Sequence, residues 1–311
     1  MKIETVVTCA CAIGICTACG GSSGPTGDVT ILLEAEDSIT GGLAAGTAEE
    51  DVIDGWSVSY DTFVTTIGDL QLGRSATGAS QRDTRLVVVD AASLPATGFT
   101  LAHFTGLEAQ RWDVLSFRTP AATAAATLDA SVPSADRDAM VAGGCTFLVG
   151  GAIDNPSGES CVGTSACVPA THVAFRLCIP AATDYGPCSS PDEMAGVAVV
   201  ASADTSVHVT LHGDHLWFNT FPSGAEGTVE RRAQWLANCD ADHDGTVTQA
   251  ELEATSAAAV FTTANHYDLA GSPRIDGHGI QTAWDFVRAQ MSTLGHFQGE
   301  GECPWAVSSG I

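Results

Sequence analysis

The sequence predicts a mainly β protein: a β-sandwich or jelly-roll-like body followed by a helical segment at the C-terminal end. Short apolar segments, several with period-two alternation, run from residue 29 to residue 221 between clusters of Gly, Pro, Asp and Ser. This pattern is typical of antiparallel strands. After Pro222 the apolar spacing changes to the three- and four-residue period of helices. Apolar residues make up 45% of the 311 residues and charged residues 16%, which is enough to build a substantial core.

The N-terminus predicts export. Residues 1–18 carry one Lys and then a short apolar run, too brief to span a bilayer, which is typical of a removed signal peptide. Residues 19–28 are rich in Gly and Ser, so we expect a flexible tether there. The segment Cys16-Thr17-Ala18-Cys19 resembles the lipobox of bacterial lipoproteins. This resemblance implies cleavage before Cys19, a lipid on its thiol and a cell-envelope location, as in outer-membrane lipoproteins. The alternative is plain secretion to the periplasm or the extracellular space.

The β-rich domain is expected to cover residues 29–221. We predict eight strands there: Val29–Ala35, Trp56–Ile67, Arg85–Ala91, Phe99–Leu107, Ala109–Phe117, Cys145–Ala152, His172–Ile179 and Ala195–Leu211. Two further runs are candidates for a short helix: Ala121–Ala126 and Ser134–Val141. Strands at this spacing favour a sandwich or a jelly roll over a repeat architecture.

Cysteine usage agrees with export. Of the 11 cysteines, four lie in residues 1–19 and seven follow. In an oxidising compartment we expect six of these seven to pair and one to stay free. The cysteines between Cys145 and Cys188 lie among Gly, Pro and Ser, which favours local disulfide bonds. Their spacings do not match the paired C-x2-C pattern of zinc sites.

The charge of the chain points to cations as partners. It carries 12 basic and 37 acidic residues, for a net charge of −25. Such a surface repels phosphate backbones and anionic lipid headgroups, so we expect no nucleic-acid binding. Contact with a membrane is expected only through the lipid anchor.

Residues 222–311 form the predicted helical segment. Thr228 is expected to cap a helix whose apolar stripe carries Val229, Ala233 and Leu236. A second, longer helix is predicted by the spacing of Ile280, Trp284, Val287, Met291 and Leu294. Both stripes are expected to pack on the β body or on each other.

A specific motif lies between these helices. Residues Asp240–Glu251 have acidic side chains at positions 1, 3, 5 and 12, Gly at position 6 and apolar Val247 at position 8. The segment resembles the EF-hand calcium loop, and Ca²⁺ prefers six to eight hard oxygen ligands. The resemblance implies ligands from Asp240, Asp242, Asp244, the carbonyl of Thr246, Thr248 through water and bidentate Glu251. No second good loop follows, so we expect a structural ion and not a sensor.

The histidines form a second candidate metal site. Period-two geometry places His208, His212 and Asp214 on one face of a strand end, and a bulge at Gly213 would turn His215 toward His212. His296, after the last helix, could supply a third imidazole. Such sites suit Cu²⁺ or Zn²⁺. The alternative is a hydrogen-bonded strand end in which Asp214 orients an imidazole.

No catalytic motif is found. The string Gly20-Gly21-Ser22-Ser23-Gly24 fits a nucleophile elbow but lies in the tether, not on a strand-to-helix turn. We therefore expect an exported, lipid-anchored calcium-binding protein with a structural or binding role. A copper- or zinc-binding surface protein is the alternative, and an unrecognised β-sandwich hydrolase or lyase is the third.

Overall fold

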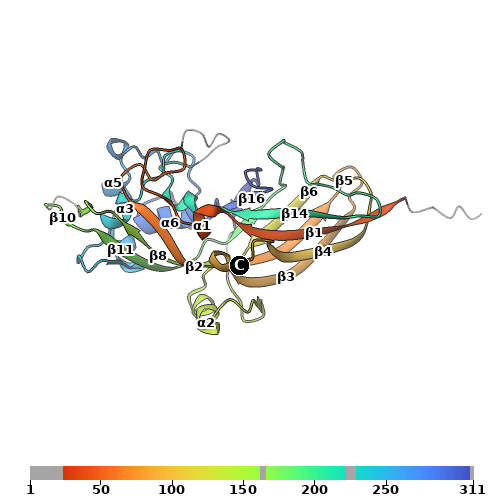
Figure 1. Ribbon diagram of the computed structural model, residues 1–311, viewed down its shortest axis with the longest axis horizontal. Coiled ribbons are helices and arrows are strands. Elements are labelled where there is room, and N and C mark those ends of the chain that lie inside the picture. The colour runs from red at the N-terminus through yellow and green to blue at the C-terminus, as the bar shows by residue number, and fades with distance from the viewer. Residues whose placement is uncertain (1–23, 162–165, 222–228, 309–311) are drawn as a thin grey trace, which may run out of the picture.

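The computed structural model describes residues 24–161, 166–221 and 229–308. Within them the protein is mainly β, as predicted, and elongated, with long strands toward one end and most helices toward the other (Figure 1). The predicted signal peptide, the lipobox and Thr228 lie outside the described residues. The first strand, β1, begins at Thr26, inside the stretch predicted as a tether. None of the described helices has both the length and the apolar character needed to cross a membrane.

The smaller of the two main sheets has four strands. Their order is β16 (Gly295–Phe297), β14 (Asp204–Leu211), β1 (Thr26–Ala35) and β4 (Phe99–Glu108). Alternate residues of β1 are buried, as expected for a strand with one face on the core. β14 pairs in parallel with β1, with His208 opposite Leu32, and in antiparallel fashion with β16.

The larger sheet has nine strands. Seven of them follow the order β15 (Thr246–Val247), β11 (His172–Ile179), β8 (Phe147–Asp154), β2 (Ser57–Gly73), β6 (Val114–Thr119), β12 (Thr183–Tyr185) and β17 (Trp305–Val307). The other two are β3 (Ser80–Asp90), which pairs with β2, and β7 (Thr127–Leu128), which pairs with β3. Two short ribbons are separate from the main sheets: β9 (Glu159–Ser160) with β10 (Val168–Pro169), and β5 (Arg111–Trp112) with β13 (Val197–Ala198).

The sheets are mixed, and not purely antiparallel as predicted. The pairs β1–β14, β3–β7 and β11–β15 are parallel. Period-two burial looks the same in both strand directions, so the sequence pattern does not report direction. Two predicted strands are also divided: Ala109–Phe117 gives β5 and β6, and Ala195–Leu211 gives β13 and β14.

One apolar core joins the two sheets and the C-terminal segment. It includes Ile31 of β1, Phe63 of β2 and Phe286 of α6 (Ala283–Met291). The ring of Phe286 stacks on Phe261 with centroids 3.9 Å apart. The C-terminal segment is not purely helical, because it supplies β15, β16 and β17 to the sheets. Most residues of the two predicted apolar stripes belong to this core: Ala233, Leu236, Trp284, Val287, Met291 and Leu294, with Ile280 packed against it.

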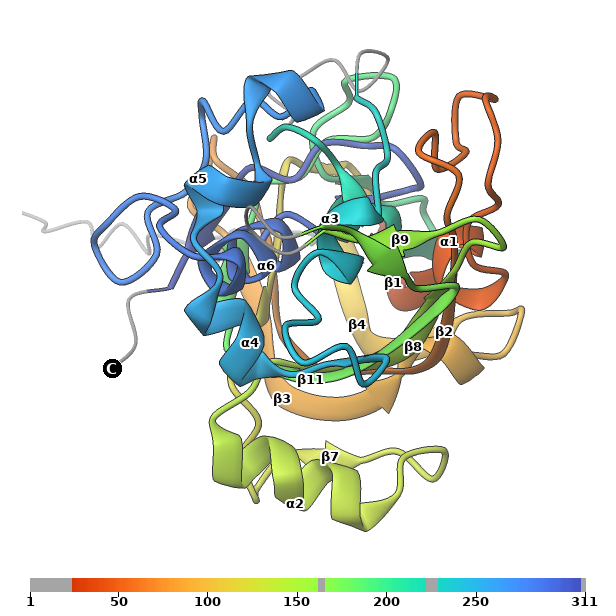
Figure 2. The same cartoon turned by 90° about the vertical axis from the view of Figure 1, so that its left-hand side faces the viewer.

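A second, smaller core lies on the other face of the larger sheet. It contains Val64 and Leu148, whose chain neighbours Phe63 and Val149 belong to the main core. Adjacent strand residues point to opposite faces. The helix α2 (Ser134–Gly143) covers this outer face, and Figure 2 shows it beneath the sheet together with β7. Helix α2 confirms the predicted run Ser134–Val141, whereas Ala121–Ala126 forms turns and no helix.

The helix predicted around Val229 and Leu236 is much shorter than expected. Helix α3 covers only Gln234–Ala237. A carboxylate oxygen of Asp54 accepts the backbone N–H groups of Ala233 and Gln234, each at 2.9 Å. A side chain distant in sequence therefore satisfies the first N–H groups and sets where this helix begins.

The last helix, α6, is bounded by a local signal. Thr282 precedes it and forms a capping box with Asp285, so Ile280 lies before the helix. Leu294 lies after its end and is fully buried. The other helices in the described part of the C-terminal segment are α4 (Gln249–Ala254), α5 (Ala257–Val260) and the 3-10 helix η4 (Thr263–Asn265).

Six of the seven later cysteines pair, as predicted. The disulfide bonds are Cys145–Cys178, Cys161–Cys167 and Cys188–Cys303. Cys239 is buried and free. The expectation of local bonds is correct for the first two pairs and wrong for Cys188, which pairs 115 residues away and ties the C-terminal end to the β body.

Candidate functional site

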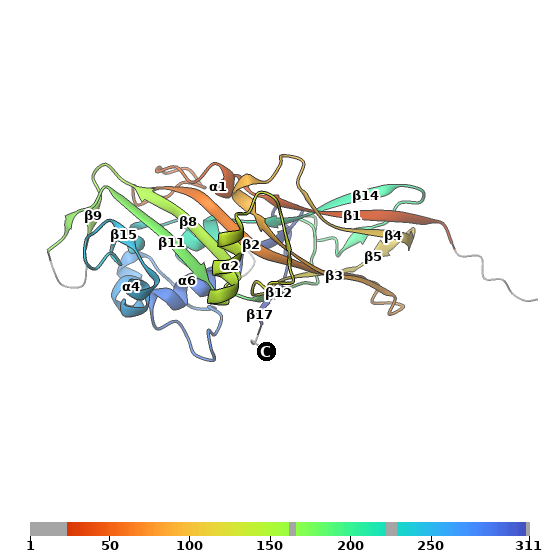
Figure 3. The ribbon, with the colours of Figure 1, turned by 90° about the horizontal axis from the view of Figure 1, so that it is seen from below.

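The acidic loop Asp240–Glu251 lies at one edge of the larger sheet. It follows α3 and runs into the first turn of α4. Its residues Thr246 and Val247 form β15, which pairs with β11, and Figure 3 shows β15 and α4 beside that strand. The side chain of Val247 is buried in the main core. The loop is therefore attached to the sheet by backbone pairing and by one apolar side chain.

Three carboxylates of this loop converge. One oxygen atom from each of Asp240, Asp242 and Glu251 lies within 4.8 Å of the others. His243 and Gly245 have left-handed φ values of +60° and +83°, which turn the chain sharply between the carboxylates. A glycine adopts this conformation without steric cost. Three negative charges at this separation repel one another unless a cation lies between them.

Backbone N–H groups orient the acidic side chains. Asp240 accepts hydrogen bonds from the N–H groups of Asp244 at 3.2 Å and Gly245 at 3.1 Å. The same N–H of Asp244 also donates to a carboxylate oxygen of Asp242 at 3.2 Å. The carboxylate of Asp244 accepts the N–H of Thr246 at 2.8 Å and is not among the three that converge. The side chain of Thr246 is exposed.

Glu251 reaches back across the loop from α4. Its Oε1 accepts the N–H of Ala241 at 2.9 Å, and its Oε2 accepts both the N–H and the hydroxyl of Thr248 at 2.8 Å. Burial opposes ionisation of Glu251, but the hydrogen bonds from Thr248 and Ala241 outweigh it and lower the pKa of this carboxyl. Glu251 is therefore held in its charged form. Thr248 caps α4 and lies against Glu251.

The three histidines come from the strand β16 and from the turn at the end of β14. His212 comes directly after β14, and His296 lies in β16, opposite Thr210. His215 lies in the 3-10 helix η2 (Asp214–Trp217). At the turn, a Cβ on Gly213 would lie 2.6 Å from a side-chain carbon of Ile39, so the close approach requires glycine here.

The imidazole rings are close together and buried. Ring centroids are 4.2 Å apart for His212 and His296, 5.1 Å for His215 and His296, and 5.6 Å for His212 and His215. One ring nitrogen of each lies within 4.8 Å of the others, and each residue is at most 6% exposed. His208 is outside this cluster, and its Nδ1 pairs with Glu34 at 2.6 Å.

Burial controls the charge of two of these imidazoles. It lowers the pKa of His215 well below the usual value, and the neighbouring His212 and Arg231 add to the effect. Burial also lowers the pKa of His296, with His212 and His215 acting in the same direction and a hydrogen bond to the Gly301 backbone opposing them. Both rings are therefore neutral near pH 7, the form in which imidazole binds metal ions.

Asp214 does not orient an imidazole. Its Oδ2 accepts a hydrogen bond from Nε of Arg231 at 2.8 Å, in a pair whose two side chains are 3% and 13% exposed. Its Oδ1 is buried and has no hydrogen-bond partner among the described residues. Asp214 could still share a metal ion with His212 and Glu36. One oxygen of Asp214, one of Glu36 and a nitrogen of His212 lie within 4.8 Å of one another.

An acidic pocket opens beside His212. Its volume is about 420 Å³, and it is lined by Glu36, Glu49, Glu50, His212, Asp214, Arg231, Glu300 and Glu302. Burial raises the pKa of Glu36, with His212 opposing and Asp214 reinforcing this shift. Six carboxyl groups share the pocket with one guanidinium, so it attracts cations.

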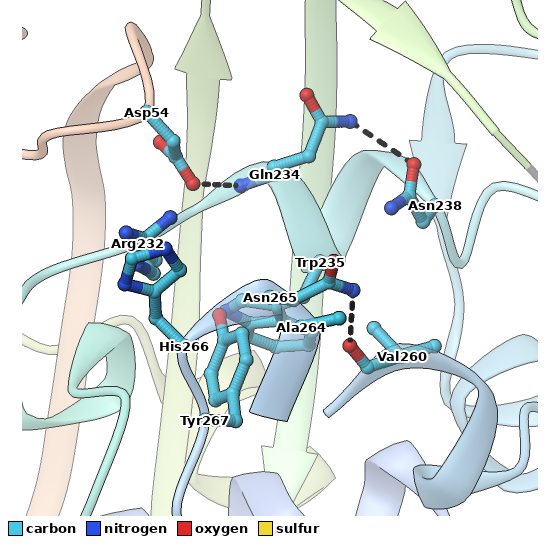
Figure 4. A pocket seen from close by; sticks show the side chains of 10 residues that line it. All are labelled: Asp54, Arg232, Gln234, Trp235, Asn238, Val260, Ala264, Asn265, His266 and Tyr267. Atoms are coloured by element: carbon cyan, nitrogen blue, oxygen red, sulfur yellow. Dashed lines mark hydrogen bonds between the residues drawn. The ribbon is translucent and has the colours of Figure 1, made fainter. Parts of the chain in front are cut away.

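Another pocket lies against α3, just before the acidic loop. It has a volume of about 280 Å³, and Figure 4 shows side chains from α3 and from the segment after α5 around it. Three buried polar atoms at this site have no hydrogen-bond partner among the described residues: Asp54 Oδ1, Trp235 Nε1 and Tyr267 OH. Burial raises the pKa of Asp54, against the hydrogen bonds that Gln234 and Ala233 donate to it.

The sequence did not identify several residues of these sites. Glu36, Arg231, Thr293 and Glu300 come from separate segments and carry no local motif. Their roles depend on tertiary contacts that residue spacing does not report.

Comparisons with models of protein families, with curated proteins and with solved structures found no match to this chain.

Proposed function

We propose that this protein binds one Ca²⁺ ion in the loop Asp240–Glu251 and that the ion has a structural role. The observation that supports this is the convergence of oxygen atoms from Asp240, Asp242 and Glu251 within 4.8 Å. The resemblance of the same twelve residues to the EF-hand loop gives the ion its identity, because Ca²⁺ is held by hard oxygen ligands at this spacing. The carbonyl of Thr246, Asp244 and a water beside Thr248 would complete the coordination.

The position of the loop favours a structural ion. In paired EF-hands each loop is supported by a second loop, whereas here β15 adds to β11 of the main sheet. The flanking helices are short, with four residues in α3 and six in α4. A bound ion would neutralise the converging carboxylates and hold both helices against the sheet edge. We expect a dissociation constant of roughly 10⁻⁴ to 10⁻³ M, as in extracellular modules.

The proposed location is the cell envelope, with a lipid on Cys19. The three disulfide bonds support an oxidising compartment. Calcium at millimolar concentration is compatible with a weak site outside the cytosol. Anchoring would place this acidic, cation-binding domain at a membrane surface without direct contact between its strands and the lipid.

Titration calorimetry on the chelator-treated protein tests the calcium site. We expect one Ca²⁺ per chain, and we expect Glu251→Gln to weaken binding by at least tenfold because it removes a charged, bidentate ligand. Glu253→Gln is the matched control: Glu253 lies on the same helix, is exposed and accepts a hydrogen bond from the side chain of Gln249. Equal loss in both variants, or no binding by the wild type at millimolar Ca²⁺, would exclude the proposal.

A further inference from the structure

We propose that His212, His215 and His296 bind a transition metal ion, Zn²⁺ or Cu²⁺, in a site separate from the calcium loop. Imidazole nitrogens are typical ligands of these borderline ions and poor ligands of Ca²⁺. Nitrogens 4.8 Å apart share a centre about 2.8 Å from each, whereas Zn–N bonds are about 2.0–2.1 Å long. Small side-chain rotations would close this difference.

The backbone places two of the ligands firmly. β14 and β16 are hydrogen-bonded neighbours, and the N–H of His212 donates to the carbonyl of Leu294 at 3.1 Å. The disulfide Cys188–Cys303 ties down the chain seven residues after His296. Ligands that are held on paired strands lose little entropy when a metal binds.

A chain of hydrogen bonds fixes the tautomer of His215. The hydroxyl of Thr293 donates its only proton to the carbonyl of Gln290 at 2.8 Å. The same hydroxyl lies 2.8 Å from Nδ1 of His215, so it accepts the proton that Nδ1 carries. The lone pair of neutral His215 is then on Nε2. Partners of this kind orient metal-binding histidines in known sites.

His212 faces two oxygen atoms. Its Nε2 lies 3.3 Å from the carbonyl oxygen of Gly299, and its Nδ1 lies 3.5 Å from a carboxylate oxygen of Glu36. A metal ion bound to one ring nitrogen would replace the oxygen contact on that side, while the other nitrogen keeps its oxygen partner as a hydrogen-bond acceptor.

The acidic pocket gives the site an open side. His212 belongs both to the imidazole cluster and to the pocket lining, so an ion in the pocket meets this ring directly. One oxygen of Asp214 and one of Glu36 lie within 4.8 Å of a His212 nitrogen, so either carboxylate can add an oxygen ligand. The pocket would concentrate cations and leave a coordination position for a water molecule or a small ligand.

The test uses Cu²⁺ and Zn²⁺ on the full mature protein. We expect one Cu²⁺ whose electron paramagnetic resonance spectrum shows coupling to imidazole nitrogens, and one Zn²⁺ by calorimetry. His215→Gln should weaken both by at least a hundredfold. His208→Gln is the control, because His208 lies on β14, four residues before His212, and pairs with Glu34. Glu251→Gln should leave Cu²⁺ binding unchanged, because it alters only the calcium loop.

Thr293→Val keeps the test valid if the histidine variant does not fold. It preserves the shape of the side chain, removes the tautomer-fixing hydroxyl and should weaken Zn²⁺ by about 10- to 100-fold. A Cu²⁺ spectrum with oxygen ligands only, or wild-type affinity in both His215→Gln and Thr293→Val, would overturn the proposal.

Discussion

Arg231 and Asp214 form an ion pair inside the acidic pocket, with Nε of Arg231 2.8 Å from Oδ2 of Asp214. Arg231 also donates to the backbone carbonyl of Glu49 at 2.7 Å and lies over the ring of Phe218. A single guanidinium thus connects the turn that carries His212 with the segment around Glu49, which also lines the pocket.

We predict that Arg231→Gln lowers the free energy of unfolding by about 3 kcal/mol, because it leaves the buried Asp214 carboxylate without its counter-charge. Chemical denaturation measures this change. Arg85→Gln should cost less than about 1 kcal/mol, since Arg85 pairs with Asp83 at the surface and its side chain is 69% exposed. If both variants lost the same unfolding free energy, the buried Arg231–Asp214 pair would stabilise the protein no more than a surface pair. Adding Asp214→Asn to Arg231→Gln should recover part of the loss.

Calcium should slow the chemical labelling of Cys239. This thiol is buried, is the free cysteine of the described residues and directly precedes Asp240. If labelling requires the loop to open, Ca²⁺ at ten times its dissociation constant should reduce the rate about tenfold by mass action. A thiol reagent with an optical readout tracks the reaction. Glu251→Gln should label at the same rate with and without Ca²⁺, and a calcium effect that persists in this variant would contradict the assignment.

The buried carboxyl of Asp54 predicts a pH dependence of stability. Its pKa is raised in the folded protein, so the folded state binds this proton more tightly than the unfolded state. The contribution of Asp54 to stability is therefore present below about pH 3.9 and is lost as pH rises through the folded-state pKa. The unfolding free energy of the wild type minus that of Asp54→Asn should therefore decrease as pH rises from about 3.9 through the folded-state pKa.

Asp129→Asn is the control for this titration. The hydroxyl and N–H of Ser131 lower the pKa of Asp129, so its contribution is present above about pH 3.9 and is lost as pH falls. The unfolding free energy of the wild type minus that of Asp129→Asn should therefore increase as pH rises from the folded-state pKa of Asp129 to about 3.9. Slopes of the same sign in both variants would contradict the assigned environments.

Cys19→Ser should prevent lipid attachment, because the thiol is the acyl acceptor that the lipobox resemblance implies. Expression in a lipoprotein-producing bacterium, combined with intact-mass analysis and membrane fractionation, measures the outcome. We expect a diacylglycerol-modified N-terminal Cys19 in the wild type and an unmodified protein in the variant. A mature N-terminus elsewhere would leave plain secretion as the export route.

Much of the fold is predictable from local sequence patterns. The strand His172–Ile179 is predicted to the residue, because its alternating burial matches its alternating apolar residues. The direction of β14 and the pairing of Cys188 with Cys303 are not predictable in this way, since both depend on which distant segments meet. The short helix α3 likewise begins where Asp54, far away in sequence, supplies a carboxylate.

The two candidate sites also differ in how much of each can be predicted from the sequence. The proposed calcium loop is contiguous, so its ligand types and spacing are visible in twelve residues. The imidazole cluster needs a strand, a turn and a distant strand to meet, and its supporting residues Thr293 and Glu36 have no signal in the sequence. Asp214 shows most clearly what local sequence cannot predict. Its position beside two histidines in the sequence favours a contact with an imidazole. In the structure it pairs with the guanidinium of Arg231 instead, because opposite charges pair when buried.

A crystal structure of the protein grown with millimolar Ca²⁺, with anomalous scattering data to identify the ion, tests whether the loop Asp240–Glu251 binds calcium. We expect one Ca²⁺ bound by Asp240, Asp242, Glu251 and the carbonyl of Thr246, with oxygen ligands at about 2.3–2.6 Å. A loop without an ion under these conditions, or Ca²⁺ bound only elsewhere on the acidic surface, would contradict it.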